Sequence, residues 1–462
     1  MRAILTVLGM AFLVWAGSVG TMSMNGECLQ NRGAIAKRGE YKVPHGKMVA
    51  VTVDLRDLST TGDAGVAIAS VHIDGDFLID GTDEQDIEML LRELEQTIAT
   101  YTLSDSESEL EQRLIGVMSR HGGSRLVGTD AHAIAVATSR AILGDRESHV
   151  SRDHASRKAR NCESESRDTS ISEVAQATAN ASTNWAHAPA WQTLQPLILQ
   201  QQPYEPAMQM ALDEVLARAV AAGIMQPALR IWQWASPAVV IGAYQSVGSE
   251  VNAAEAEQAG FAMVRRITGG GAMFVQPQDT ITYSLYAPLD FAQGLTVTQT
   301  YRLCDQWLLD ALHSLGIRAE SQPINDIGVP QGGKIGGAAE RRFPVPSRRA
   351  VGRSAGGHQG RGCLLHHVTM AYGIDAGRMA RILRVSAEKM KDKAVRSARK
   401  RVEPLNTQTS LSRDQLAALL EQYALQHMTS ARRALVPSQL LDEAVELARS
   451  KYSDPTWTYR IA

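Results

Sequence analysis

The stretch Arg265-Arg266-Ile267-Thr268-Gly269-Gly270-Gly271-Ala272 is the most informative part of this 462-residue sequence. Three consecutive glycines after a predicted strand give a turn without side chains, so a ligand can approach the backbone and meet its N–H groups. The two arginines before the turn offer paired donors to a carboxylate or phosphate. An ordinary tight turn also explains three glycines. The spacing matches neither a Walker A loop nor a dinucleotide-binding fingerprint, so an anion bound here requires another fold.

Two later segments carry further candidate residues. In Asn325-Asp326, followed by Gly332-Gly333-Lys334-Ile335-Gly336-Gly337-Ala338, a lysine between glycines can reach an anion, and the aspartate offers the oxygen ligand that Mg²⁺ prefers. In the predicted strand Leu364–Met370, His366 and His367 point to opposite faces, so they cannot both contact one ligand. A surface lysine in a hairpin and a buried, hydrogen-bonded histidine are the alternatives from the residues alone.

Composition excludes several classes of protein. Lys+Arg 47 against Asp+Glu 49 gives a net charge of −2, which disfavours a nucleic-acid partner. No second long apolar run follows the N-terminus, so a polytopic membrane protein is excluded and membrane association is not expected. The four cysteines (Cys28, Cys162, Cys304 and Cys363) match no CxxC or zinc spacing, and reduced thiols are expected.

The N-terminus is typical of a secretory signal peptide. Arg2 precedes an apolar run from Ala3 to Ala16, and small residues follow. The alternative is a translation start at Met22, Met24 or Met48, with residues 1–39 as a lead-in.

The next part of the chain divides into a folded unit and a linker. Residues 40–143 are predicted to form a small α+β unit, with strands over 49–55 and 65–79 and helices over 87–98, 107–118 and 131–143. Residues 144–184 contain few large apolar side chains and are predicted to be a flexible linker.

The larger unit begins at residue 185. Its predicted elements are helices over 206–222 and 303–315 and strands over 229–234, 238–244, 262–267 and 280–286. We divide it into a catalytic domain, 185–408, and a C-terminal segment, 409–462, with amphipathic helices over 411–428 and 438–452. The arginine- and glycine-rich stretch 342–362 is predicted to be a surface insertion, with a phosphate-binding loop as the alternative.

Taken together, the motifs resemble the lipoate–protein ligase A family. The order Arg-Arg-x-Thr-Gly-Gly-Gly, Asn-Asp-x₇-Lys-x-x-Gly, Leu-Leu-His-His and Lys391-Asp392-Lys393 lies within residues 195–408. The resemblance implies an α+β fold: a mixed-sheet catalytic domain of the biotin/lipoate ligase type with a small α+β accessory domain. Residues 40–47 and Gly75-Asp76-Phe77 resemble that accessory domain, which here precedes the catalytic one.

The resemblance also implies a two-step reaction. ATP activates lipoate or octanoate as an acyl-adenylate, and a lysine of a lipoyl domain then attacks it. The acceptors are the lipoyl domains of 2-oxoacid dehydrogenase E2 subunits and the glycine cleavage H protein, and the expected location is the cytoplasm. The implied roles are catalysis by Lys334, Mg²⁺ binding by Asp326, nucleotide binding by Asn325, Gly336 and Ala338, and substrate binding by Trp232, Arg266, Thr268, Gly269, Gly270, Gly271 and His367.

The sequence departs from the family in the acyl pocket. Phe274-Val275-Gln276 stands where the family usually has Tyr/Phe-His-Asp, so a histidine near the ligand is missing. The alternatives are an octanoyl or lipoyl transferase of the same fold, which forms a thioester on a cysteine, and a lipoate- or nucleotide-binding protein without activity. Such transferases place the cysteine shortly before the lysine motif, where this chain has Gln322-Pro323-Ile324-Asn325.

Overall fold

The computed structural model describes residues 35–44, 46–57, 66–81, 84–102, 105–144, 188–200, 202–330, 332–346, 360–384, 386, 388 and 402–461. Several predictions fall outside these residues: the signal-like N-terminus, the linker over 145–184, and the Lys391-Asp392-Lys393 motif. Residues 347–359 of the predicted insertion, Cys28 and Cys162 lie outside them as well.

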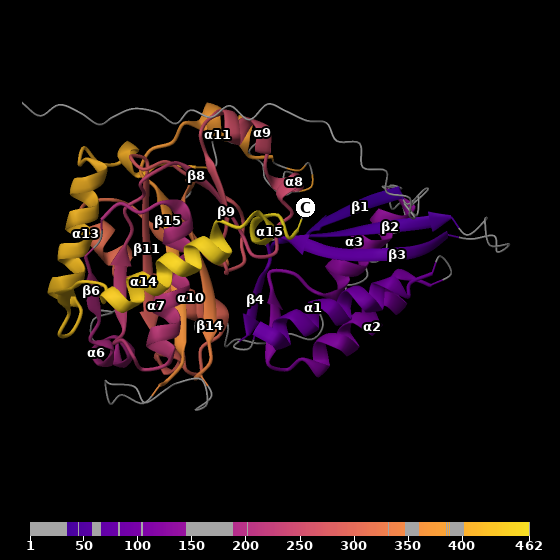
Figure 1. Cartoon of the computed structure of the whole chain (residues 1–462), viewed down its shortest axis with the longest axis horizontal. Coiled ribbons are helices and arrows are strands. Elements are labelled where there is room, and N and C mark those ends of the chain that lie inside the picture. The colour runs from indigo at the N-terminus through magenta and orange to yellow at the C-terminus, as the bar shows by residue number, and fades with distance from the viewer. Residues whose placement is uncertain are drawn as a thin grey trace, which may run out of the picture.

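The N-terminal unit is a small α+β fold (Figure 1). The strands β1 (Ile35–Lys42), β2 (Met48–Asp57) and β3 (Val66–Gly75) form an antiparallel sheet, against which α1 (Glu84–Ala99) and α3 (Ala131–Leu143) pack, and α2 (Glu107–Arg120) packs on these two helices. The predicted helices are present. The strand expected over 65–79 is divided into β3 and β4 (Leu78–Gly81), and β4 pairs with the unpredicted β5 (Ser124–Val127).

The larger unit is built on a mixed eight-stranded sheet in the order β12-β13-β14-β15-β11-β7-β6-β16. Within it only the pairs β16–β6 and β6–β7 are parallel, and the other pairs are antiparallel, so the α+β fold class is confirmed. The bounds are β6 Leu197–Leu199, β7 Ala228–Ile231, β11 Thr280–Ala287, β12 Glu320–Gln322, β13 Asp326–Gly328, β14 Lys334–Phe343, β15 Cys363–Ala371 and β16 Arg432–Ala434.

Helices cover both faces of this sheet. On one face α10 (Val297–Ser314) and α13 (Arg413–His427) enclose a core that includes Ile281, Tyr283 and Leu285 of β11. On the other face α7 (Pro206–Ala221) and α14 (Ser438–Leu447) enclose a second core. The remaining helices are α6 (Pro189–Leu194), α8 (Val247–Glu250), α9 (Ala253–Gln258), α11 (Ala376–Ile382), α15 (Pro455–Thr458), the 3₁₀ helices η3 (Leu289–Ala292) and η5 (Leu405–Thr407), and the π-helix η6 (Ala448–Tyr452).

Residues 409–462 do not form a separate segment, in contrast to the predicted division. Strand β16 extends the central sheet by pairing with β6, and α14 packs on α7. The buried guanidinium of Arg265 donates hydrogen bonds to the carbonyl oxygens of Thr458 (2.9 Å) and Ile461 (3.3 Å). The C-terminus therefore completes the catalytic unit.

A three-stranded sheet, β10-β8-β9, carries the glycine-rich loop. Its strands are β8 (Ala238–Ile241), β9 (Ala262–Arg265) and β10 (Met273–Val275), and the loop over 266–272 joins β9 to β10. The edge strand β10 pairs antiparallel with β8. The loop lies at the boundary with the N-terminal unit, because the amide of Gly270 donates to the carbonyl oxygen of Phe77.

The two units are docked through specific contacts near this loop. The rings of Phe77 and Tyr244 stack with centroids 5.3 Å apart, and the amide of Gly75 donates to the carbonyl oxygen of Tyr244 at 2.9 Å. An ion pair of 2.7 Å joins Arg342 on β14 to Asp80 on β4. Arg342, predicted as the start of an insertion, thus belongs to the interface.

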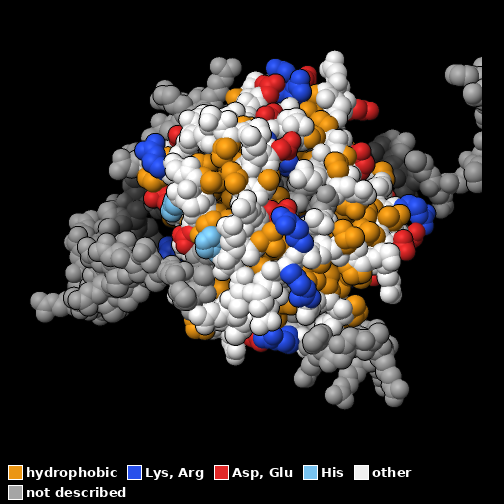
Figure 2. Space-filling view, turned by 90° about the vertical axis from the view of Figure 1, so that its left-hand side faces the viewer, with side chains coloured by type: hydrophobic (Ala, Val, Ile, Leu, Met, Phe, Trp, Pro, Cys, Tyr) orange, Lys and Arg blue, Asp and Glu red, His pale blue; other side chains and the backbone are white. Residues whose placement is uncertain are grey.

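The outer surface of the catalytic unit is mixed in character. On the face shown in Figure 2, basic and acidic side chains are scattered among hydrophobic and neutral ones. Within the part of the chain that the structure describes, no helix has the length and apolar character needed to cross a membrane.

Candidate active site

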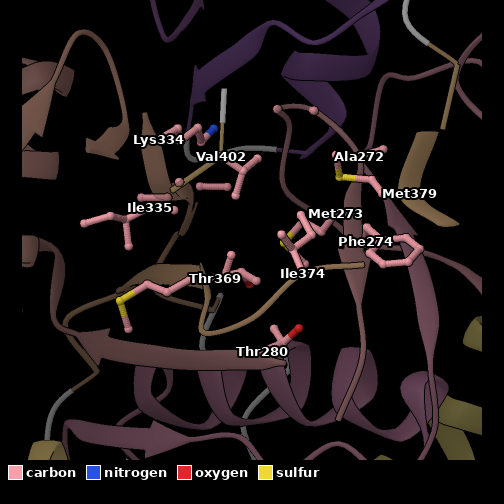
Figure 3. Close-up of a pocket in the computed structure, with 18 of the residues that line it drawn as sticks. Ala272, Met273, Phe274, Thr280, Lys334, Ile335, Thr369, Ile374, Met379 and Val402 are labelled. Carbon is pink, nitrogen blue, oxygen red and sulfur yellow. The ribbon is translucent and has the colours of Figure 1, made fainter. Parts of the chain in front are cut away.

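A cavity of about 250 Å³ lies between β14, β15, the glycine-rich loop and α11. One part of its lining is polar or cationic and comes from Lys47, Arg266, Asn325, Lys334 and His367. Another part is apolar and comes from Met273, Phe274, Ile335, Met370, Ile374, Met379, Leu383 and Val402. Figure 3 shows Lys334 beside Val402, with Met273, Ile374 and Phe274 further along the cavity. The cavity therefore suits a ligand with an anionic head and an apolar chain.

Lys334 is the first residue of β14, at the polar part of the cavity. Its Nζ lies 2.8 Å from Oδ1 of Asp326, and its side chain is 43% exposed, so it can reach a ligand. The backbone at this point is held from the other side, because the amide of Glu403 donates to the carbonyl oxygen of Lys334 at 2.9 Å. Lys334 and Asp326 thus form an ion pair beside the cavity.

A second lysine enters the same cavity from the N-terminal unit. The Nζ of Lys47 donates to Oδ1 of Asn325 at 2.7 Å, and the Nδ2 of Asn325 donates to the carbonyl oxygen of Ala338. Asn325 thus links Lys47 of the N-terminal unit to strand β14.

Arg266 holds the shape of the glycine-rich loop. Its side chain is 4% exposed, and it donates to the carbonyl oxygens of Val240 (3.2 Å), Gly269 (2.6 Å) and Gly271 (2.9 Å). Burial lowers the pKa of Arg266 to about 10, so the guanidinium is charged at neutral pH. Arg266 lines the cavity as expected, but these donors are used on the loop rather than on a carboxylate.

The glycines of the loop have different surroundings. A Cβ on Gly269 would lie 2.6 Å from the carbonyl oxygen of Phe77, and Gly270 has a φ of +91°, which favours glycine. The amide of Gly270 also donates to the carbonyl oxygen of Phe77 at 3.2 Å. Gly269 is therefore needed for the approach of the N-terminal unit, whereas Gly270 and Gly271 line the cavity.

His367 is fixed by a hydrogen-bonded chain that ends at the loop. Burial lowers the pKa of His367, so the neutral form donates from Nδ1 to Oδ2 of Asp213 at 2.7 Å. Its Nε2 then accepts from the hydroxyl of Thr268 at 2.8 Å, and Thr268 in turn accepts from Nε of Arg266 at 3.0 Å. This chain positions Arg266 and the carbonyl groups that it holds.

Asp213 anchors this chain in the core. Burial acts to raise the pKa of Asp213, but the cation of Arg230 and the hydrogen bond from His367 outweigh it and lower that pKa. Its carboxylate also accepts from Arg230 (2.7 Å), Ser284 (2.7 Å) and Tyr286 (2.6 Å). Asp213 is thus ionised and fully hydrogen-bonded at neutral pH.

His366 points to the opposite face of β15, as the strand geometry predicted. Its ring nitrogens lie 2.8 Å from Asp305 and 2.9 Å from Glu340. Burial acts to lower the pKa of His366, but the two carboxylates outweigh it and raise that pKa to about 9. The thiol of Cys304 lies close to Glu340 and His366, with all three potential ligand atoms within 4.8 Å of one another. His366 is a buried ion-pair residue outside the cavity.

Eight of the predicted site residues line the cavity, and four do not: Trp232, Thr268, Gly269 and Asp326. Trp232 is completely buried in the core and donates from Nε1 to the hydroxyl of Ser284 at 2.9 Å. The structure therefore does not support its predicted contact with an acyl chain. The hydroxyl of Thr268 is hydrogen-bonded to Arg266 and His367, which do line the cavity. The predicted residues that line the cavity are Arg266, Gly270, Gly271, Asn325, Lys334, Gly336, Ala338 and His367.

Val275, where the sequence differs from the family, does not line the cavity. Val275 is fully buried in the core, whereas its neighbours Phe274 and Gln276 line the cavity.

The cavity contains residues that the sequence did not identify. Lys47 and Asn325 are 278 residues apart in the sequence, and they come into contact only because the two units dock. The apolar wall at Met273, Phe274 and Met379 had no distinctive pattern. The signal for Lys47 was present in the motif of residues 40–47, which resembles the accessory domain.

The described cysteines lie away from this cavity. Cys304 and Cys363 are completely buried, and burial raises the pKa of each thiol well above its usual value. Within the described part of the chain, no cysteine lines the cavity.

Comparison with known families agrees with this arrangement of residues. Residues 205–424 match the model of the lipoyl protein ligase A/B catalytic domain. That segment belongs to this family.

Two curated relatives illustrate the breadth of the lipoyl ligase family. An octanoyltransferase LipM from Brevibacillus brevis is 26% identical over 282 residues, which cover 55% of this chain and 95% of the relative. A lipoate-protein ligase A subunit 1 from Thermoplasma acidophilum is 27% identical over 262 residues, covering 56% of this chain and 95% of the relative. The names of these two relatives differ in the reaction, octanoyl transfer in one and lipoate ligation in the other.

A solved structure of a bipartite lipoate protein ligase and its E2 lipoyl domain from T. acidophilum aligns with a TM-score of 0.48 and 25% identity. The alignment covers 58% of this chain and 96% of that one.

Proposed function

We propose that this protein is an ATP-dependent lipoate–protein ligase. It activates lipoate or octanoate as an acyl-adenylate and transfers the acyl group to a lysine of a lipoyl domain. The observation that carries the proposal is the cavity, which combines a lysine, Lys334, with an apolar wall and, within the described residues, contains no cysteine.

The polar part of the cavity fits the activation step. The lipoate carboxylate attacks the α-phosphorus of ATP, a P–O bond to the carboxylate forms, and pyrophosphate leaves with its bonding electrons. Two anions must approach each other in this step, and Lys334 supplies a positive charge that offsets their repulsion and stabilises the transition state. Asp326, 2.8 Å away, orients the ammonium group before the substrates bind.

The apolar wall fits the acyl chain. Met273, Phe274 and Met379 provide flexible and aromatic surface, and contact with a hydrocarbon chain is favourable by about 0.8 kcal/mol for each buried CH₂ group. The acyl-adenylate is then attacked at its carbonyl carbon by the amine of the acceptor lysine, and AMP leaves. In this step the buried loop held by Arg266 keeps its backbone groups in place around the carboxyl end.

A magnesium ion would fit the carboxylate of Asp326, because Mg²⁺ is usually bound by one or two carboxylates together with substrate phosphates. When bound, the ion neutralises phosphate charge. Lys334 shares the Asp326 carboxylate, so this aspartate orients a cation in either case.

The second candidate is an octanoyltransferase, which the LipM relatives favour. That reaction requires a reactive cysteine thiolate near the acyl group. Cys304 and Cys363 are buried with raised pKa values, so neither suits this role. The transferase reaction would have to use Cys28 or Cys162, which lie outside the described residues.

The experiment compares acyl donors with the full-length chain and a purified lipoyl domain. Lipoate and octanoate are supplied with Mg·ATP, octanoyl carrier protein is supplied without ATP, and biotin with Mg·ATP serves as a control. We expect modification of the lipoyl domain only from the free acids and only with ATP. Modification from the carrier thioester without ATP would establish the transferase instead.

The acceptors that we propose are the lipoyl domains of 2-oxoacid dehydrogenase E2 subunits and the glycine cleavage H protein. We place the reaction in the cytoplasm, because ATP, Mg²⁺ and these acceptors are present there in bacteria. Mass spectrometry of the N-terminus of the native protein tests the location, since removal of residues 1–20 by a signal peptidase would contradict it.

A further inference from the structure

We infer that Lys47, contributed by the N-terminal unit, binds the phosphates of the nucleotide in the active site. The inference rests on the proposed function, because ATP is the phosphate-bearing substrate of that reaction. It assigns to the N-terminal unit a direct part in the site, so the nucleotide site is complete only when the two units are docked.

The position of Lys47 is fixed by its own unit. Its backbone follows a tight turn in which the amide of Val43 donates to the carbonyl oxygen of Lys47 at 3.1 Å. On the other side, the amide of Lys47 donates to the carbonyl oxygen of Gly128 at 2.5 Å. The stem of the side chain passes close to Gly128, where a Cβ would lie 2.4 Å from Cγ of Lys47. The side chain is thereby directed out of its own unit.

The ammonium group of Lys47 ends at the cavity. It lies 2.7 Å from Oδ1 of Asn325, the residue next to Asp326, whose carboxylate holds Lys334 at 2.8 Å. Two lysines from different units are therefore held by neighbouring residues of one turn, and both line the same cavity.

The charges at the cavity explain why a second lysine is useful. Lys334 is paired with Asp326, and the donors of Arg266 are used on loop carbonyls. The Nζ of Lys47 contacts the amide oxygen of Asn325, which is a neutral group. A polyphosphate needs several cations nearby, and a lysine is a compact charge suited to phosphate oxygens. Lys334 serves the carboxylate and α-phosphate, and Lys47 serves the phosphates on the Asn325 side.

Docking of the N-terminal unit near the cavity is supported independently of Lys47. The carbonyl oxygen of Phe77 accepts from Gly270 at 3.2 Å, and the same oxygen lies where Gly269 has no side chain. The ion pairs of Asp80 with Arg342 (2.7 Å) and of Glu84 with Arg341 (3.2 Å) lie on β14, the strand that begins with Lys334. The N-terminal unit therefore contacts both the loop and the strand that form the cavity.

The experiment measures binding of Mg·ATP to the full-length chain by calorimetry, together with lipoate-dependent exchange of pyrophosphate into ATP. Three variants separate charge from hydrogen bonding. Lys47→Met removes both, Lys47→Gln keeps a donor for Asn325 without the charge, and Lys47→Arg keeps the charge. The matched control is Lys37→Ala, an exposed lysine of β1 in the same unit. Thermal unfolding of each variant checks that the units are folded.

We expect Lys47→Met and Lys47→Gln to weaken Mg·ATP binding about tenfold or more and to lower pyrophosphate exchange by on the order of 10²-fold. Lys47→Arg is expected to stay within about threefold of the parent chain, as is Lys37→Ala. If Lys47→Gln binds Mg·ATP as tightly as the parent chain, the hydrogen bond to Asn325 suffices without the positive charge, and the inference is overturned. Binding within twofold of the parent in Lys47→Met would also overturn it.

The two readouts separate this inference from the proposed function. A parent chain that binds Mg·ATP through Lys47 but shows no lipoate-dependent exchange refutes the ligase and supports the inference. A parent chain that performs exchange with no effect of Lys47→Gln supports the ligase and refutes the inference. A parent chain that does not bind Mg·ATP refutes both.

Discussion

The substitution Gly269→Ala tests whether the glycine-rich loop is shaped by the N-terminal unit. The φ angle of Gly269 lies outside the left-handed region, so alanine is compatible with the backbone, and the effect comes from the added methyl group alone. That methyl would lie 2.6 Å from the carbonyl oxygen of Phe77 and 3.1 Å from Cα of Leu78. Both are backbone atoms, which cannot rotate away.

The size of the effect follows from these distances. An ordinary contact begins at 3.4 Å, so the backbone at Phe77 must retreat by about 0.8 Å, and the hydrogen bond from Gly270 to the same oxygen is strained. Overpacking of this kind typically costs about 1–3 kcal/mol. We therefore expect Gly269→Ala to reduce the free energy of unfolding by about that amount and to reduce pyrophosphate exchange.

The assay is urea unfolding followed by intrinsic fluorescence, with pyrophosphate exchange measured on the same preparations. Gly122→Ala is the matched control, because a Cβ at Gly122 meets no atom within 4 Å. The control is expected to change the unfolding free energy by less than about 0.5 kcal/mol. If Gly269→Ala unfolds at the same urea concentration as the control and keeps full exchange activity, the interlocking of loop and N-terminal unit is refuted.

Three further predictions concern Lys334, the buried ion pairs of His366 and helix α2. Lys334→Ala should lower pyrophosphate exchange by about 10²–10³-fold. Its unfolding free energy should stay within about 1 kcal/mol, because the pair with Asp326 is partly exposed; full activity would contradict the assignment. The pKa of His366 is raised from 6.5 to about 9, so its ion pairs stabilise the fold fully below pH 6.5. This contribution to the free energy of unfolding, about 3 kcal/mol, is lost as the pH rises through 9. Urea midpoints that do not fall between about pH 6.5 and 9.5 would contradict this. Gly116→Ala inside α2 meets no atom within 4 Å and should raise the unfolding free energy by about 0.5–1 kcal/mol; a lower urea midpoint would contradict it.

The sequence predicted the regular elements because their patterns are local. The apolar spacing of Leu90, Leu94 and Ile98 is a property of one helix, and α1 buries these residues as expected. The motif at Lys334 and Asp326 was also local, since eight residues of a hairpin separate the two side chains. The bond between them therefore agrees with the spacing.

The parts of the site that sequence reasoning did not predict depend on distant contacts. Lys47 reaches Asn325 only because two separately folded units dock, and no pattern near residue 47 indicates the partner. Trp232 was expected at the acyl chain from the family resemblance, but it lies in the core beside Arg230, whose guanidinium is 4.2 Å from the ring centroid. Residues 409–462 read as separate helices because β16 is three residues long, too short to be recognised as a strand.

Activation of the acyl group by ATP without a cysteine is tested most directly by one measurement. Lipoate-dependent exchange of labelled pyrophosphate into ATP is followed with the parent chain and with the variant Cys28→Ser/Cys162→Ser, which removes the cysteines outside the described residues. We predict equal exchange by both proteins, and no exchange when lipoate is omitted. An absence of exchange, together with acyl transfer from octanoyl carrier protein that the double variant has lost, would contradict the ligase and establish a cysteine-dependent transferase.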